Sequence, residues 1–303
     1  MKIVANRKLF YAFSGCMVAA SLAAIAVFGL KQGIDFTGGS LLSVRYEERP
    51  SPVEAEQALA DLGLGGITVQ PVGETDMNFR MKSLDEETHQ RVLEALRGGF
   101  GAVTELEFNS IGPSVGKELR QKSTLALVVV FLAILAYVAW SFRKVSMPVQ
   151  SWKYGAITLI SAFHDVIVPV GLFAVLGKVA GVEIGTSFIA AVLTIMGYSI
   201  NDTIVVLDRV RENLQRSGGA FADIVERSVQ QTMLRSLNTS LTTVLAMAAV
   251  YLFGGASIRD FALALIVGIA VGTYSSIFVM SPLLVTWNLW DLKRKREQVK
   301  GKP

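Results

Sequence analysis

The segment TSFIAAVLTIMGYSINDTIVVL, at residues 186–207, decides the fold class of this chain. It contains no Lys, Arg or Glu, and its only acidic residue is Asp202. An α-helix of about 20 mostly apolar residues is long enough to cross the ~30 Å hydrocarbon core of a membrane. The segment therefore predicts a transmembrane helix that carries one acid inside the bilayer.

Five further segments have the same apolar character. The chain has 303 residues, of which 51% are hydrophobic and 18% are charged, and its mean hydropathy is +0.46. An average soluble domain is about 25% charged, so the composition indicates a membrane protein and excludes a disordered chain, a collagen-like fibre and a disulfide-rich scaffold. The six predicted spans are residues 10–30, 124–142, 155–176, 186–207, 236–253 and 261–287.

The first apolar segment allows two interpretations. Ala24-Ile25-Ala26 fits the small-residue pattern of a signal-peptide cleavage site. The apolar stretch around it is as long as a full membrane span. We therefore favour an uncleaved transmembrane helix.

The distribution of Lys and Arg predicts the orientation, because basic residues concentrate in the cytoplasmic segments of membrane proteins. If the chain crosses the membrane six times, its four segments rich in Lys and Arg all fall on one side of the membrane. The short loops on the other side hold one basic residue each, Lys178 and Arg259. Both chain ends are therefore predicted to be cytoplasmic. The basic residues on that side are Lys2, Arg7, Lys8, Arg143, Lys144, Lys153, Arg209, Arg211, Arg216, Arg227, Arg235, Lys293, Arg294, Lys295, Arg296, Lys300 and Lys302.

Residues 31–122 form one large insertion on the opposite side of the membrane, and their pattern predicts an α+β domain. Strands are expected at residues 41–47, 67–72, 77–82 and 103–109, with helices at 52–62 and from about 84 to 97. Ser51 and Ser83 are the expected N-caps of these two helices. The order β-α-β-β-α-β is that of a ferredoxin-like domain, a fold that by itself identifies no function.

The chain thus divides into four predicted parts. Residues 1–30 are the cytoplasmic N-terminus and first span, 31–122 the outer domain, 123–287 a bundle of five transmembrane helices, and 288–303 a basic cytoplasmic tail.

Residues 208–234 predict an amphipathic helix, broken at residues 217–219, that lies along the membrane surface. Gly268 and Gly272 have the spacing of a close helix contact.

Motifs of soluble enzymes are missing from the sequence. SIGPSVGKE, at residues 110–118, superficially resembles a phosphate-binding loop, but Ile111 stands where that loop needs its first glycine and Glu118 replaces its Ser or Thr. Two histidines and one cysteine, Cys16, give no zinc-binding pattern and no intrachain disulfide. We therefore expect no catalytic site, metal, cofactor or nucleic-acid partner.

Asp202 and Arg235 are the first candidates for function. A charge at the bilayer centre costs at least ~2.5–3.5 kcal/mol, so an intramembrane acid usually faces a partner or a water-filled path. Asp202 lies about 9 Å before Asp208 along a helix axis, and Arg235 begins the fifth span at a comparable depth. These positions predict a proton-responsive Asp202–Arg235 pair, and the alternative is a static clamp between helices. The supporting polar residues are Asn201, Asn238, Thr239 and Thr242.

Asp165 and His164 are a second candidate site, near the middle of the third span. Because they are neighbours in sequence, their side chains are not expected to face each other on a helix. Either residue could line a proton path. The alternative, which the sequence leaves equally open, is a buried hydrogen-bond anchor between helices.

An ordered set of motifs resembles the SecF family, whose members are subunits of the bacterial SecDF translocation complex in the RND superfamily. GIDFTGGS at residues 33–40 and IGPSVGKEL at 111–119 flank the outer domain. The remaining motifs follow in the spans: AFHDV (162–166), GYSINDTIVVLDRVREN (197–213), RSLNTSLTT (235–243), YLFGG (251–255) and GTYSSIFV (272–279). The resemblance covers nearly the whole chain except residues 50–100.

The resemblance implies a partner chain, SecD, together with the SecYEG channel, YajC and, indirectly, SecA. It also implies a bacterial cytoplasmic membrane and use of the proton-motive force to draw preproteins outward after entry driven by SecA. The functional Asp and Arg of the family correspond to Asp202 and Arg235, and His164 and Asp165 also match its sequence. The expected mechanism is that protonation of Asp202 weakens its interaction with Arg235, so that helices shift and the outer domain moves.

Two other functions remain as alternatives. An RND-type exporter of lipids or small molecules shares the six-span plan and the intramembrane acids, but usually carries two such halves in one chain. A purely structural subunit would have no proton role. We expect a half-transporter of six transmembrane helices with one ferredoxin-like outer domain.

Overall fold

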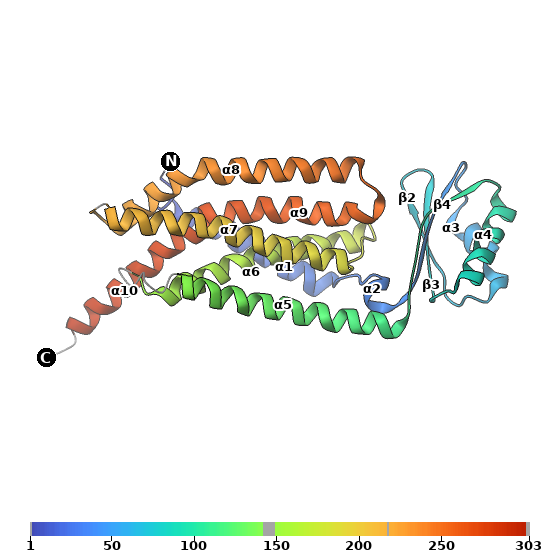
Figure 1. Ribbon diagram of the computed structural model, residues 1–303, viewed down its shortest axis with the longest axis horizontal. Coiled ribbons are helices and arrows are strands. Elements are labelled where there is room, and N and C mark those ends of the chain that lie inside the picture. The colour runs from blue at the N-terminus through green and yellow to red at the C-terminus, as the bar shows by residue number, and fades with distance from the viewer. Residues whose placement is uncertain (1, 142–148, 217, 301–303) are drawn as a thin grey trace. The chain divides into compact units, whose positions relative to one another are not determined.

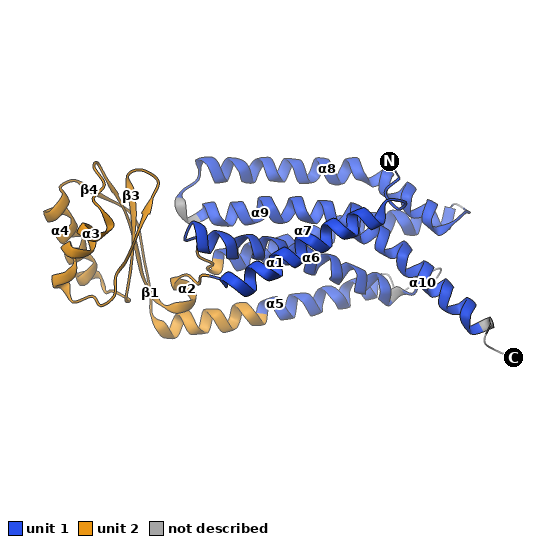
Figure 2. Cartoon of the chain, turned by 180° about the vertical axis from the view of Figure 1, so that it is seen from behind, with its two compact units in different colours: residues 1–30, 126–182, 187–303 blue, residues 31–125, 183–186 orange. Residues whose placement is uncertain are grey.

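The computed structural model describes residues 2–141, 149–216 and 218–300. Phe142, Arg143, Lys144 and Lys302, which enter the predictions above, lie outside the described residues. The chain separates into two compact units, coloured in Figure 2. The membrane unit comprises Met1–Leu30, Ala126–Val182 and Ser187–Pro303, and the second unit comprises Lys31–Leu125 and Glu183–Thr186. We call the second unit the outer unit, after the location predicted for it from the sequence.

The membrane unit is built from helices joined by short connections (Figure 1). Within the described residues, six helices are long and apolar enough to cross a membrane, which confirms the predicted number of spans. The sixth is continuous through α9, the π-helical turn η2 and α10. The helices are α1 (Arg7–Phe28), α5 (Pro113–Ser141), α6 (Ser151–Val179), α7 (Thr186–Arg216), α8 (Phe221–Phe253), α9 (Ala256–Ser275), η2 (Ser276–Met280) and α10 (Ser281–Lys300).

Small residues allow the membrane helices to approach closely. A Cβ atom added to Gly268 of α9 would lie 2.2 Å from the side chain of Ile195 on α7, and one added to Gly272 would lie 3.1 Å from Ser199 Cβ. The predicted packing role of these two glycines is therefore confirmed. Large apolar side chains such as Leu132 and Leu241 are instead exposed on the outer surface of the unit, as expected for helices surrounded by lipid.

The segment between the fourth and fifth spans is helical on both sides of its predicted break. Helix α7 continues as far as Arg216 and α8 begins at Phe221, so both helical parts are extensions of the neighbouring spans. The predicted break at residues 217–219 falls between them, although Ser217 lies outside the described residues. The expected position along the membrane surface stays a prediction. The buried Asn213 side chain joins the two extensions by donating hydrogen bonds to Ser228 Oγ at 2.8 Å and Gln231 Oε1 at 2.9 Å, so their polar residues bond to each other.

The outer unit contains one antiparallel sheet with the strand order β2-β3-β1-β4. The chain runs β-α-β-β-α-β through it, which confirms the predicted α+β domain. Its core is apolar and includes the fully buried side chains of Leu42, Phe79 and Leu96. The elements are α2 (Ile34–Thr37), β1 (Gly39–Tyr46), α3 (Pro52–Ala58), η1 (Ala60–Leu62), β2 (Thr68–Val72), β3 (Asp76–Met81), α4 (Glu86–Phe100) and β4 (Val103–Ile111).

The helix caps of this unit match one prediction and correct another. Ser51 caps α3 in a complete capping box with Glu54, as expected. The predicted cap Ser83 is wrong, because α4 begins later and its N-cap is Asp85, which accepts a hydrogen bond from the Thr88 backbone amide at 3.0 Å. Hydrogen bonding by Thr88 lowers the pKa of Asp85. An ionised carboxylate at this position is favoured because it faces the positive end of the helix dipole.

Candidate functional site

Asp202 lies on the inward face of α7 and is only 6% exposed. Its Oδ1 atom accepts a hydrogen bond from Ser236 Oγ of α8 at 2.6 Å. Its Oδ2 atom is buried and has no hydrogen-bond partner among the described residues. The carboxyl group is therefore half satisfied, which is unusual because most buried polar atoms have at least one partner.

Arg235 is the residue next to Ser236, but its side chain is exposed and forms no ion pair with Asp202 among the residues that the structure describes. Instead it lines a cleft of about 240 Å³ between α7 and α8. The direct hydrogen-bond partner of Asp202 is thus the hydroxyl group of Ser236. The cationic residue Arg235 is the neighbour of that serine in the sequence. The cleft is lined by Ile204, Val205, Asp208, Arg209, Glu212, Gln231, Thr232 and Arg235.

The four supporting polar residues predicted from the sequence do not surround Asp202. Asn201, Asn238, Thr239 and Thr242 are all exposed. The hydroxyl groups of Thr239 and Thr242 donate hydrogen bonds to carbonyl groups of their own helix. Together with Arg235, the last three form a polar face of α8, because they recur at three- and four-residue spacing and are all exposed.

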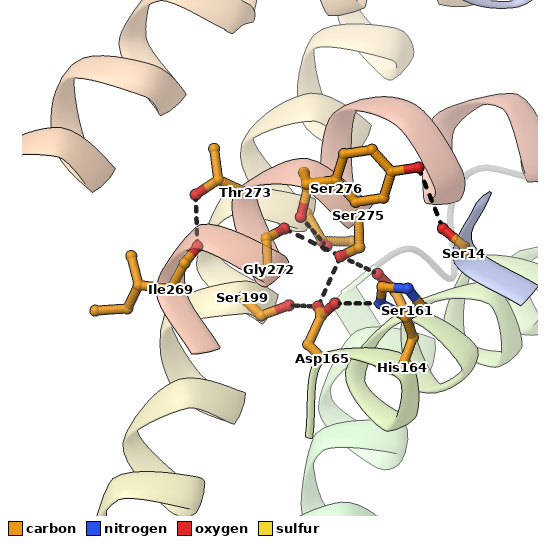
Figure 3. A network of polar contacts seen from close by, with 12 residues as sticks. Ser14, Ser161, His164, Asp165, Ser199, Ile269, Gly272, Thr273, Ser275 and Ser276 are labelled. Carbon is orange, nitrogen blue, oxygen red and sulfur yellow. Dashed lines mark hydrogen bonds and ion pairs between the residues drawn. The ribbon is translucent and has the colours of Figure 1, made fainter. Parts of the chain in front are cut away.

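Asp165 of α6 is fully buried and accepts hydrogen bonds on both oxygen atoms (Figure 3). Its Oδ1 atom lies 2.8 Å from His164 Nδ1, and its Oδ2 atom accepts hydrogen bonds from Ser199 Oγ and, at 2.7 Å, from Ser275 Oγ. The expectation that His164 and Asp165 do not face each other is wrong. Both residues are buried, and the imidazole turns toward the adjacent carboxylate because buried polar groups need a partner.

Further hydroxyl groups extend this arrangement across four helices. Ser161 Oγ lies 3.1 Å from Ser275 Oγ, and Thr203 Oγ1 of α7 lies 3.0 Å from Ser276 Oγ. Ser240 Oγ of α8 lies 2.5 Å from Thr273 Oγ1 of α9. These contacts converge where α9 passes into the π-helical turn η2, and π-helical turns frequently occur at functional sites.

Sequence reasoning missed the hydroxyl partners of both acids, namely Ser236, Ser199 and Ser275. One signal was present on α8, where Thr232, Ser236 and Ser240 recur every four residues and are all buried. That spacing places them on one helix face. The structure shows that this face, rather than the neighbouring face with Arg235, contacts α7.

The described part of the chain holds no group of three or more His, Cys, Asp or Glu residues that could bind a metal ion. The two acids are instead surrounded by neutral hydroxyl groups and one imidazole. Such groups accept and donate protons in hydrogen bonds. The carboxyl groups and the imidazole of this arrangement are groups that can gain and lose a proton.

Comparison with known proteins identifies the family. A family model described as the C-terminal part of the protein export membrane protein SecD/SecF matches residues 92–290, and a model of the SecD/SecF GG motif matches residues 23–48. The protein translocase subunit SecF of Thermobaculum terrenum is 41% identical over 96% of this chain and 95% of its own length. The protein translocase subunit SecF of Anaerolinea thermophila is 38% identical over 95% of this chain and 94% of its own length.

The solved structures lead to the same family. The crystal structure of SecDF from Thermus thermophilus, described as a translocon-associated membrane protein, matches with a TM-score of 0.82 and 34% sequence identity. The match covers 95% of this chain, whereas this chain spans only 38% of that SecDF chain. The resemblance drawn from the ordered motifs is thus confirmed, and the chain belongs to the SecD/SecF family of protein export membrane proteins.

Proposed function

We propose that this chain uses the proton-motive force, together with a SecD partner, to assist preprotein translocation after entry driven by SecA. The observation that carries the proposal is the half-satisfied carboxyl group of Asp202, whose Oδ1 atom is held by Ser236 and whose buried Oδ2 atom has no partner in the described structure. A carboxyl group with a free, buried oxygen can take up a proton without first breaking another contact.

Protonation of Asp202 would change what the carboxyl group needs from its surroundings. The ionised group only accepts hydrogen bonds, whereas the protonated group also donates one. Ser236 is the direct contact between Asp202 and α8. A change in the charge of Asp202 would therefore alter the contact between α7 and α8. It would also change the electrostatic potential at Arg235, which lines the cleft between the same two helices.

The energy of the proton gradient suits a small rearrangement of this kind. Moving one elementary charge through 100 mV supplies about 2.3 kcal/mol. That amount can bias two helix arrangements of similar stability, but it is too small to unfold a stable domain.

The exposed polar face of α8 supports a protein partner in the membrane. On this face, Arg235 and Asn238 would be costly to expose to lipid, whereas Thr239 and Thr242 bond to carbonyl groups of their own helix. We propose that SecD covers this face, and that the assembly works with the SecYEG channel, with YajC and, indirectly, with SecA. The same proposal places the chain in a bacterial cytoplasmic membrane with both termini on the cytoplasmic side.

We propose no catalytic site, metal or cofactor for this chain. Its work would consist of conformational change driven by protons, without covalent chemistry. The alternative of an RND-type exporter of lipids or small molecules receives less support, because the matched relatives are named as protein translocase subunits. The participation of His164 and Asp165 in proton transfer remains a prediction.

The test uses inverted membrane vesicles that contain this chain, its SecD partner, SecYEG and SecA. Asp202→Asn keeps the shape of the side chain and its acceptor oxygen but removes the titrating group. We expect it to abolish the stimulation of preprotein translocation by the proton-motive force while leaving assembly with SecD intact.

The matched control is Asp223→Asn, which removes an exposed carboxylate in the first turn of α8, away from the cleft that Arg235 lines. This variant should retain the full stimulation. Stimulation that persists in Asp202→Asn would contradict the proposed role of this residue.

A further inference from the structure

The loop that precedes α7, Glu183–Thr186, belongs to the outer unit rather than to the membrane unit. It pairs with the segment that leads from α1 toward the outer sheet. Gly33 N donates a hydrogen bond to Ile184 O at 2.9 Å, and Ile184 N donates one to Lys31 O at 2.8 Å. Gln32 and Ile184 thereby form a β-bridge, so the start of α7 is joined to the chain that enters β1.

Asp35 fixes the first residue of α7. Its Oδ2 atom accepts hydrogen bonds from Thr186 N at 2.6 Å and from Thr186 Oγ1 at 2.7 Å. A carboxylate that binds the first amide groups of a helix stabilises its N-terminus, and here the carboxylate comes from a distant part of the sequence. A Cβ atom on Gly185 would lie 2.5 Å from Asp35 Oδ2, so this close approach depends on glycine.

Arg80 connects the same loop to the sheet. It lies on β3, forms an ion pair with Glu183, and donates a second hydrogen bond from Nη2 to Gln32 O at 3.2 Å. The other carboxylate oxygen of Glu183 lies 3.2 Å from Lys31 Nζ. The Arg80 and Glu183 side chains are only about a quarter exposed, so solvent screens their attraction less than that of a surface pair.

The segment between these contacts has little room to move. Gly38 has a φ of +74°, and a Cβ atom there would lie 2.8 Å from Pro113 Cα at the start of α5. A Cβ atom on Gly116 of α5 would lie 2.8 Å from Gly38 N. The segment that carries Asp35 is thus held between the loop before α7 and the first turn of α5.

We infer that Asp35, Arg80 and Glu183 are positioning residues that transmit movement of α7 into the sheet of the outer unit. The inference rests on the proposed function, because α7 also carries Asp202, sixteen residues after Thr186 and about 24 Å along the helix axis. A helix transmits displacement along its axis because its hydrogen bonds resist stretching. Asp35 holds the end of that helix, and the Arg80–Glu183 ion pair continues the connection into β3.

The experiment measures two quantities in vesicles that contain the chain, SecD, SecYEG and SecA. One is the stimulation of preprotein translocation by the proton-motive force, and the other is proton flux, followed with a pH-sensitive dye inside the vesicles. Arg80→Glu and Glu183→Arg each break the ion pair, and the double variant restores it with reversed charges. Asp35→Ala removes the cap, whereas Asp35→Asn keeps an acceptor oxygen. Arg45→Glu is the control, because it breaks the Arg45–Asp76 ion pair of the same sheet away from the loop.

We expect each single variant of the ion pair, and Asp35→Ala, to lower the stimulation roughly fivefold or more while proton flux continues. The double variant and Asp35→Asn should regain most of the stimulation, and Arg45→Glu should keep it. A purely structural defect would reduce flux and stimulation together.

The inference is overturned if the ion-pair variants keep their stimulation while Asp202→Asn has lost it, or if the assembled double variant is no better than its single parents. Stimulation that persists in Asp202→Asn would instead overturn the proposed function, and the transmission inferred from it. Co-purification with SecD reports whether each variant assembles. Should Asp35→Ala fail to assemble, the charge reversal still decides the question.

Discussion

The two buried carboxylates of the membrane unit have opposite hydrogen-bonding environments. Asp165 contacts three donor groups, from His164, Ser199 and Ser275, which occupy both of its oxygen atoms. Asp202 has one donor, Ser236, and an oxygen without a partner in the described structure. A fully satisfied buried acid joins helices and resists change, whereas a partly satisfied acid can change its protonation state and its contacts. The difference favours Asp165 as an anchor and Asp202 as the group that responds to protons.

The largest expected effect on stability comes from removing the better-satisfied acid. Asp165→Ala removes the shared acceptor of His164, Ser199 and Ser275, of which Ser275 keeps the Gly272 carbonyl oxygen as a partner. We expect this variant to lower the free energy of unfolding by roughly 3 kcal/mol. Asp202→Ala removes one hydrogen bond and should cost about 1 kcal/mol. Thermal unfolding of the full chain in detergent, followed by circular dichroism, measures both. Equal losses in the two variants would contradict the contrast between the sites.

A smaller effect is expected from removing the hydroxyl group that holds Asp202. Ser236→Ala should lower the proton-driven stimulation of translocation by roughly threefold to tenfold, because the carboxyl group would lose its direct contact with α8. Ser236→Thr keeps a hydroxyl group and should retain most of the activity.

The control for this variant is Ser240→Ala, one turn further along α8, where the hydroxyl group contacts Thr273 instead of Asp202. It should leave the stimulation nearly unchanged. If Ser236→Ala and Ser240→Ala behave alike, the contact between Ser236 and Asp202 has no special role.

The sequence predicted the fold well because its signals are strong and local. Six apolar runs gave the six spans, and alternating patterns with a Ser51 cap gave the order of the outer domain. The cap of α4 was misplaced because Ser83 and Asp85 are both good N-cap residues, and only the backbone conformation distinguishes them. Local pattern also could not show that the polar end of α7 and the polar beginning of α8 bond to each other.

The candidate site was predicted only in part. Asp202 and Asp165 stood out because a charge inside a membrane is costly wherever it faces. Their serine partners did not, because a hydroxyl group can bond to the carbonyl of its own helix and is then tolerated on any face, as Thr239 shows. Which face of α8 contacts α7 depends on tertiary packing. For that reason Arg235 was expected beside Asp202, while Ser236 occupies that place.

The most direct test of the central claim is an infrared difference spectrum of this chain with SecD in lipid membranes, recorded between two pH values. A carboxyl group that gains a proton in this interval gives a C=O band of the protonated acid. The account predicts a band that is lost in Asp202→Asn and unchanged in Asp165→Asn. A band that persists in Asp202→Asn, or that disappears only in Asp165→Asn, would contradict the assignment of Asp202 as the acid that responds to protons.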